Sequence, residues 1–126
     1  MNAISILLFF FAGVCNACMD VLRYRYNVST FRFWRNQNWV NPALSWPNKW
    51  KPESKFGDFI MSTVFVWVTD FWHLCKMLMI LCFTLGAIFY QPIFDTYPKF
   101  WLDLLILYFT FTGIFELFFS KVLIKK

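Results

Sequence analysis

Three ionisable side chains occur together where a long apolar stretch begins. Asp70, His73 and Lys76 follow one another at intervals of three residues, and side chains three or four residues apart share one face of a helix. An acid, an imidazole and an amine on one face could pair with each other, ligate a metal ion, move protons or bind a charged headgroup. The apolar residues that follow place this chemistry at the mouth of a membrane span.

The amino-acid composition is typical of a chain that lies in a bilayer. Of the 126 residues, 60% are hydrophobic, 24% are aromatic and 15% are charged, and the mean hydropathy is +0.52. A soluble domain is closer to half apolar and a quarter charged. This length has room for about three spans of ~20 residues and one substantial connection. We therefore expect an all-α membrane protein, with one integral-membrane domain over residues 1–126.

Two apolar segments have the length of single spans, about residues 4–22 and about residues 100–120. The first has no basic residue before Arg23. It is also long enough to cross a bilayer, so we interpret it as a retained helix rather than a signal peptide. All four cysteines fall in apolar segments, where we expect them to pack helix against helix rather than to form disulfides. They are Cys15, Cys18, Cys75 and Cys82.

The remaining apolar segment is too long for one span. Its run from Phe56 to Tyr90 would make a helix of about 50 Å, against a hydrocarbon core of ~30 Å. We expect an interfacial helix and then a span, together over about residues 58–90, with the span proper beginning near Phe71. The alternative is a separate short re-entrant or interfacial helix at about residues 58–69.

The connection over residues 23–57 is basic and rich in proline. It carries seven Lys and Arg residues against one Glu, a net charge of +6, and the C-terminal segment adds three lysines. Pro42, Pro47 and Pro52 predict that no long helix forms there. Because Lys and Arg gather on the cytoplasmic side of a membrane, we expect a multi-pass protein of the inner (cytoplasmic) membrane. Its N-terminus would lie outside and its C-terminus in the cytoplasm.

Under this topology the polar residues of all three spans lie at one depth, in the cytoplasmic leaflet. An ionisable residue costs about 2.5–3.5 kcal/mol at the bilayer centre, so such residues usually face protein or water. The cluster could be a salt-bridged plug that fixes helix register, a site that conducts protons or ions, or a site for a lipid headgroup. The predicted polar cluster consists of Asn16, Asp20, Asp70, His73, Lys76 and Glu116.

A metal site is a further interpretation of the same cluster. Asp20, Asp70, His73 and Glu116 have side chains that zinc and iron accept as ligands. The set contains a single histidine, and Asp70-x-x-His73 alone is a weak metal signature. The sequence has no nucleophile–base pattern, glycine-rich phosphate loop or HExxH motif. The residues therefore name no catalytic group and no cofactor.

The connection also interleaves tryptophan with basic residues. This pattern could stack on single-stranded nucleic acid, but beside a bilayer it favours Trp at headgroup level with Arg and Lys on anionic lipid phosphates. We therefore expect the connection to lie on the membrane and to bind no nucleic acid. A docking surface for a partner protein is the alternative. The residues predicted to contact lipid are Arg32, Trp34, Arg35, Trp39, Trp46, Lys49, Trp50 and Lys51.

Two short strings resemble paired motifs in a family of small integral-membrane proteins of Bacteroidetes-type bacteria. They are Ser45-Trp46-Pro47-Asn48-Lys49-Trp50-Lys51 and Thr69-Asp70-Phe71-Trp72-His73, and the resemblance covers about Trp39 to Lys76. It implies a bacterial source and a shared role for the two strings, and it implies no activity. It also suggests that the first string folds back over Asp70 and His73, with Asn48 and Lys49 as polar cover.

For function, we expect a small non-enzymatic membrane protein that acts by assembly, as a homo-oligomer or as an accessory subunit of a membrane complex. Three short helices enclose no pore alone, and their small residues suit helix contacts. One alternative is a membrane enzyme, or a metal- or lipid-binding protein, that uses Asp20, Asp70, His73 and Glu116. A second alternative is a holin-like pore former, which shares the three spans and basic tail but lacks the large aromatic connection.

Overall fold

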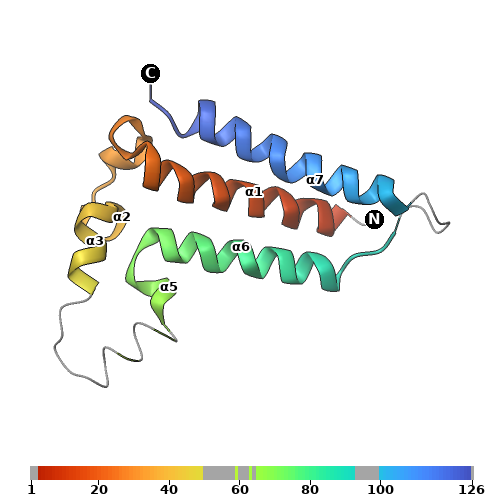
Figure 1. Ribbon diagram of the computed structural model, residues 1–126, viewed down its shortest axis with the longest axis horizontal. Coiled ribbons are helices and arrows are strands. Elements are labelled where there is room, and N and C mark those ends of the chain that lie inside the picture. The colour runs from red at the N-terminus through yellow and green to blue at the C-terminus, as the bar shows by residue number, and fades with distance from the viewer. Residues whose placement is uncertain (1–2, 50–58, 60–62, 64, 93–99, 126) are drawn as a thin grey trace.

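Three long helices make up more than half of the residues that the computed structural model describes (Figure 1). The structure describes residues 3–49, 59, 63, 65–92 and 100–125. The long helices are α1 (Ala3–Tyr24), α6 (Phe71–Ile88) and α7 (Phe100–Leu117). Three stretches, Ala3–Tyr24, Phe71–Ile88 and Trp101–Val122, are long and apolar enough to cross a membrane. These helices confirm the expected all-α membrane fold with three spans.

Helix α1 lies in the middle, between α6 and α7 (Figure 1). Glycines permit both crossings. A Cβ atom on Gly13 would stand 2.7 Å from the backbone oxygen of Phe111 on α7, and one on Gly86 of α6 would stand 3.0 Å from the ring of Phe9 on α1. The missing side chain lets the backbones of α1 and α7 approach closely at Gly13 and lets the Phe9 ring pack on α6 at Gly86. Such close contacts are usual between helices in membranes.

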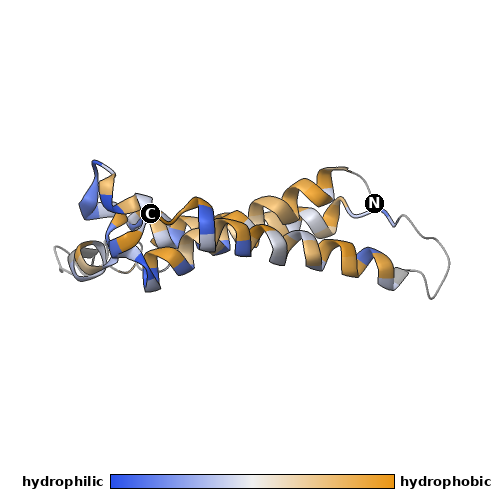
Figure 2. Cartoon of the chain, turned by 90° about the horizontal axis from the view of Figure 1, so that it is seen from above, coloured by the Kyte–Doolittle hydropathy of each residue, from blue (hydrophilic) through white to orange (hydrophobic). Residues whose placement is uncertain are grey.

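The three helices form a layer rather than a closed bundle (Figures 1 and 2). Helices α6 and α7 both pack along α1, and they meet each other where the rings of Phe83 and Phe111 lie 5.3 Å apart. Their outer faces stay open, with Ile80, Ile88 and Phe109 more than half exposed. Figure 2 shows that these helices are hydrophobic along most of their length, as expected for surfaces that face lipid.

A break at Asp70 divides the long second apolar segment. The short helix α5 (Val66–Thr69) ends there, and α6 begins at the next residue. Asp70 has extended backbone angles (φ −157°, ψ 160°), and its carboxylate accepts a hydrogen bond from the backbone N–H of His73 at 3.0 Å. This is an N-cap, which satisfies a donor that the first turn leaves without a helical partner. The span therefore begins at Phe71, as expected, and α5 falls within the alternative short helix at 58–69.

Short helical turns form the connection between α1 and α5. They are η1 (Tyr26–Val28), η2 (Thr30–Phe33), α2 (Gln37–Val40) and α3 (Pro42–Lys49). The longest of these has eight residues, which agrees with the expected absence of a long helix in the part of the connection that the structure describes. Pro42 starts α3, where a missing N–H costs nothing, but Pro47 lies within the helix.

The C-terminal tail returns to the connection. After α7, the π-helical segment η3 (Phe118–Val122) leads to an antiparallel bridge between Ser29 and Ile124. The backbone N–H of Thr30 donates to the oxygen of Leu123, and that of Lys125 donates to the oxygen of Val28, both at 2.9 Å. The basic connection and the basic tail thus meet at one end of the layer.

Two of the four free thiols are buried packing residues at that same end. All four cysteines are unpaired. Cys18 of α1 and Cys75 of α6 are buried in a cluster with Val21, Leu22 and Phe31. The apolar core of the protein therefore lies where the connection covers the ends of α1 and α6, not along the whole length of the spans.

Candidate functional site

Asp70 is a buried carboxylate with several donors around it. Its side chain is 1% exposed. Besides the N–H of His73, it accepts hydrogen bonds from the hydroxyl of Thr69 at 3.3 Å and from Nδ1 of His73 at 2.7 Å. A buried acid is tolerated when its oxygens are hydrogen-bonded in this way. Asp70 therefore both starts α6 and holds an imidazole.

His73 has its ring orientation set by that carboxylate. A carboxylate only accepts hydrogen bonds, so Nδ1 carries a proton and donates it to Oδ2 of Asp70. The other ring nitrogen, Nε2, is then an acceptor when the ring is neutral and a second donor when the ring is protonated. The His73 side chain is 21% exposed. It is therefore accessible from one side while Asp70 holds it from the other.

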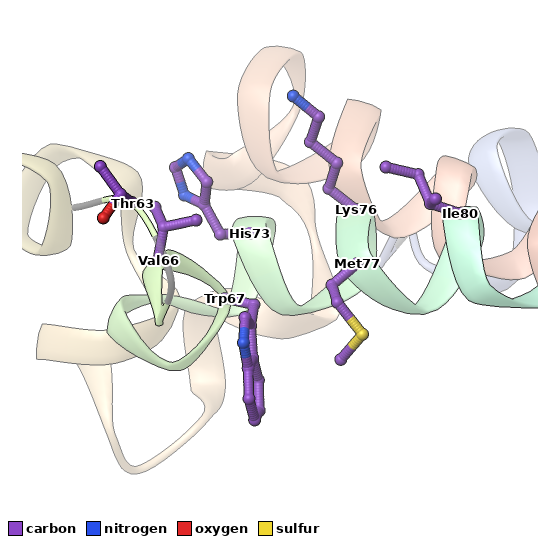
Figure 3. A pocket seen from close by; sticks show the side chains of 7 residues that line it. All are labelled: Thr63, Val66, Trp67, His73, Lys76, Met77 and Ile80. Atoms are coloured by element: carbon purple, nitrogen blue, oxygen red, sulfur yellow. The ribbon is translucent and has the colours of Figure 1, made fainter. Parts of the chain in front are cut away.

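A pocket of about 240 Å³ lies beside the His73 ring (Figure 3). Its lining comes from two segments, Thr63 with α5 and the first half of α6. In Figure 3 the side chains of His73 and Lys76 rise on the same side of α6. The lining residues are Thr63, Val66, Trp67, His73, Lys76, Met77 and Ile80. The pocket thus combines a basic part with an apolar wall.

Trp72 connects the two basic side chains of this site. Its ring packs edge-to-face on the His73 ring, with centroids 4.8 Å apart. Nζ of Lys76 lies 5.5 Å from the centroid of the same indole, within the range of a cation–π contact. The indole face therefore keeps the ammonium group near the imidazole.

An aromatic cluster covers the start of α6. The rings of Phe31, Trp34 and Trp39 lie within 5.1–5.4 Å of a neighbouring ring, and all three contact Phe71. Nε1 of Trp39 also donates to the backbone oxygen of Val68 at 3.0 Å, which ties the connection to α5. Sequence reasoning missed Phe71 as the centre of this cluster, although its place within an aromatic string was the available signal.

The two sequence strings that carry the family resemblance are in contact with each other. Trp46 of the first packs edge-to-face against Trp72 of the second, with centroids 6.1 Å apart. The connection thus folds onto the start of α6 through this contact. Among the residues predicted to contact lipid, Trp39 and Trp46 are half-buried against α6, whereas Arg32, Trp34 and Arg35 are exposed. The side chains of Asn48, Lys49, Trp50 and Lys51 lie outside the described residues.

The predicted polar cluster is only partly brought together. Asp70 and His73 are in contact, and Lys76 lines the same pocket as His73. Asn16 and Asp20 are half-buried on α1. Across the ranges that the structure describes, no group of three or more His, Cys, Asp or Glu side chains could hold a metal ion. The four proposed metal ligands therefore do not form one constellation.

Glu116 points away from the rest of the protein. The buried face of α7 contains Leu107, and Ile114 lies against Gly13 of α1. Glu116 follows Leu107 by nine residues, about two and a half helical turns, so it lies on the opposite face. Its side chain is exposed, and its carboxylate accepts a hydrogen bond from the hydroxyl of Ser120.

A second buried acid lies at the far end of the layer. Asp103 of α7 is fully buried, and it accepts a hydrogen bond from the hydroxyl of Tyr90 at 2.9 Å. Loss of hydration raises the pKa of Tyr90, and the hydrogen bond to Asp103 adds to this shift. The phenol therefore stays protonated and donates. This contact fastens the chain after α6 to the start of α7.

No family model matches the sequence, and neither a curated protein nor a solved structure matches it. The class of protein rests on the fold itself. Among the described residues, three helices are long and apolar enough to cross a membrane. A pocket with a basic part and an apolar wall lies at one end, and an acidic side chain lies on the outer face of α7.

Proposed function

We propose that the protein acts by assembly in the membrane, as a homo-oligomer in which α7 of one copy packs beside α7 of a second copy. The observation that carries this proposal is Glu116, an ionisable residue on the outer face of a helix apolar enough to span a bilayer. The expected accessory-subunit role differs only in the identity of the neighbour. A second copy is the simpler partner, because the outer face of α7 then supplies both surfaces of the contact.

The position of Glu116 makes a protein neighbour more favourable than lipid. It lies six residues before Val122, the last residue of the apolar stretch, and so about 9 Å inside it at 1.5 Å per residue. Within the described residues its carboxylate bonds to Ser120 alone. Ionisable side chains at such depths usually face other helices or water, and side chains that hydrogen-bond between helices hold membrane helices together.

Gly113 supports the same contact. Gly13 and Gly86 are both used inside the protein, where a Cβ would meet a neighbouring helix, but a Cβ on Gly113 would have no atom within 4 Å. The small residue therefore serves no contact within the described chain. A glycine on an open helix face lets a second backbone approach closely.

The outer face of α7 has the spacing of a helix–helix seam. Intervals of three and four residues keep side chains on one face, and two membrane helices pack along such a line. We call these residues the α7 seam; they are Leu105, Phe109, Gly113, Glu116 and Ser120. Copies inserted in one membrane share an orientation, so the two seams run parallel and bring Glu116 near Glu116 and Ser120 of the second copy.

The test is the mass of the purified protein in lipid nanodiscs or mild detergent, measured by native mass spectrometry over a range of protein-to-lipid ratios. We expect a dimer or a higher oligomer for the wild type. Gly113→Leu and Glu116→Leu should each weaken association about tenfold, because interhelical contacts of this kind are worth about 1–2 kcal/mol. Glu116→Gln keeps the hydrogen-bonding capacity and should associate almost normally.

Ala87→Leu is the matched control, since it enlarges an exposed small residue on the outer face of α6 and should leave the mass unchanged. A wild type that stays monomeric at every protein-to-lipid ratio would contradict the proposal.

We also propose that the end with the basic connection and tail faces the cytoplasm, because Lys and Arg are retained on that side. Val28 lies in η1 after α1, Gln91 lies after the end of α6, and both are exposed. The last residues of α1 and of α6 lie at opposite ends of the layer (Figure 1). A membrane-impermeant maleimide added to intact cells should label Gln91→Cys and spare Val28→Cys. The reverse pattern would overturn this orientation.

A further inference from the structure

We infer that the pocket between α5 and α6 binds an anionic phospholipid, with the phosphate at His73 and Lys76 and the beginning of an acyl chain along the apolar wall. This binding site is separate from the α7 seam, because it lies on another helix and involves none of the seam residues. It does not depend on the proposed assembly.

The basic part of the pocket has the chemistry that a phosphate needs. Lys76 supplies an ammonium group, and His73 supplies an imidazole whose orientation Asp70 fixes through the 2.7 Å contact at Nδ1. A phosphate oxygen accepts charge-assisted hydrogen bonds from such groups, which are stronger than hydrogen bonds between neutral partners. Because Asp70 is occupied with the ring and with the start of the helix, its negative charge is turned away from the pocket.

The apolar wall distinguishes a lipid from a free phosphate ion. The side chains of Val66, Met77 and Ile80 give the ion no hydrogen-bond partner but suit an acyl chain. The volume of about 240 Å³ is below the range of pockets that enclose whole drug-sized ligands. The pocket therefore holds the headgroup region, and the rest of the lipid's acyl chain continues along the exposed apolar face of α6.

The depth of the pocket agrees with this assignment. Lys76 lies five residues after Phe71, so it is about 7.5 Å into the span. From that depth the long side chain of Lys76 can reach toward the phosphate level at the membrane surface. The nearby connection carries a net charge of +6, which attracts anionic lipids to this end of the layer. The site thus lies where such lipids are concentrated.

The test uses the full chain, purified in nanodiscs that contain phosphatidylglycerol and phosphatidylcholine in equal amounts. Native mass spectrometry after release from the discs counts the lipids retained. We expect the wild type to retain phosphatidylglycerol in preference to phosphatidylcholine. Lys76→Ala should lower its affinity about tenfold, the effect of losing one charge-assisted hydrogen bond. Ile80→Trp should fill the apolar wall and reduce retention without changing charge.

Lys121→Ala is the matched control, because Lys121 is exposed at the same end of the layer and lies outside the pocket. It should retain the lipid as the wild type does. An equal loss in Lys76→Ala and Lys121→Ala would mean a diffuse effect of surface charge and would overturn the site. Equal retention of the two lipids by the wild type would overturn it as well.

Inorganic phosphate distinguishes the two sources of the anion. At millimolar concentration it should fail to displace phosphatidylglycerol, and Ile80→Trp should leave any phosphate binding intact. Displacement by phosphate alone would show an ion site and contradict the assignment to a lipid. The oligomeric mass of Lys76→Ala should remain that of the wild type, so failure of this inference and failure of the assembly are separate outcomes.

Discussion

Helices α1 and α7 have similar apolar stretches but very different surroundings. Each offers 22 residues able to span a bilayer, yet 39% of the most apolar part of α1 is buried within the protein, against 11% for α7. Helix α1 packs along both α6 and α7, whereas α7 packs along α1 and meets α6 at the Phe83–Phe111 contact. The length of an apolar stretch therefore specifies a span, whereas the placement of small and polar residues specifies which faces of the helix receive another helix.

The glycines of the two helices should give the largest difference. In detergent that keeps the protein monomeric, Gly13→Leu should lower the free energy of unfolding by about 3 kcal/mol, because overpacking at a close helix crossing forces backbones apart. A Cβ at Gly13 already meets a backbone oxygen at 2.7 Å, and one at Gly113 meets nothing. Gly113→Leu should therefore change stability by less than about 0.5 kcal/mol.

Both changes in the free energy of unfolding can be measured by unfolding the protein in a series of detergent mixtures and monitoring its helix content by circular dichroism. Equal destabilisation by the two substitutions would remove the distinction between the inner and the outer glycine.

The two acidic side chains of α7 show the same contrast between inner and outer positions within one helix. Asp103 is fully buried and accepts a hydrogen bond from Tyr90, whereas Glu116 is exposed on the outer face of α7. Asp103→Ala should cost about 2 kcal/mol, since it leaves the half-buried phenol of Tyr90 without its acceptor. Glu116→Ala should leave the monomer almost unchanged and act on association instead.

Tyr90→Phe removes only the donor of that pair and serves as the control for Asp103. Thermal unfolding in monomeric detergent should place it between the wild type and Asp103→Ala. If Glu116→Ala destabilises the monomer as much as Asp103→Ala does, Glu116 has a partner inside the chain.

The cover over the ends of α1 and α6 should give the smallest effect. Trp39→Phe keeps a ring against Phe71 but removes the N–H that donates to Val68. One such hydrogen bond contributes about 1 kcal/mol. We expect faster amide exchange at α5 and little change in α7, measured by hydrogen–deuterium exchange with mass spectrometry. Uniform acceleration in all three long helices would mean that this contact supports the whole layer.

Some of this architecture can be predicted from the sequence, because it depends on length. The apolar run that ends at Tyr90 exceeds the bilayer thickness, and that excess predicts a break near Phe71, where the structure has one. The N-cap is also local, since Asp70 precedes the backbone N–H of His73 by three residues. Features that depend only on one turn of helix or on the thickness of the bilayer can therefore be predicted from the sequence.

The arrangement of the polar residues around the helices could not be predicted in the same way. Depth places Glu116 level with Asp70 and His73, but it gives no direction around the helix axis. That direction is set by the packing of Leu107 and Ile114 on α1, which depends on the order of the helices in the layer. For the same reason the contact of Trp46 with Trp72 was not predicted from the sequence.

The most direct test of the assembly is a cysteine cross-linking scan along α7 in native membranes. Seam positions Leu105, Phe109 and Gly113, and the exposed flanking positions Leu104 and Tyr108, are changed to Cys one at a time. The wild type, whose four cysteines are buried or half-buried thiols, is the blank. We predict that mild oxidation gives disulfide-linked dimers at the seam positions and none at the flanking ones. Equal cross-linking at all five positions, or at none, would contradict the account.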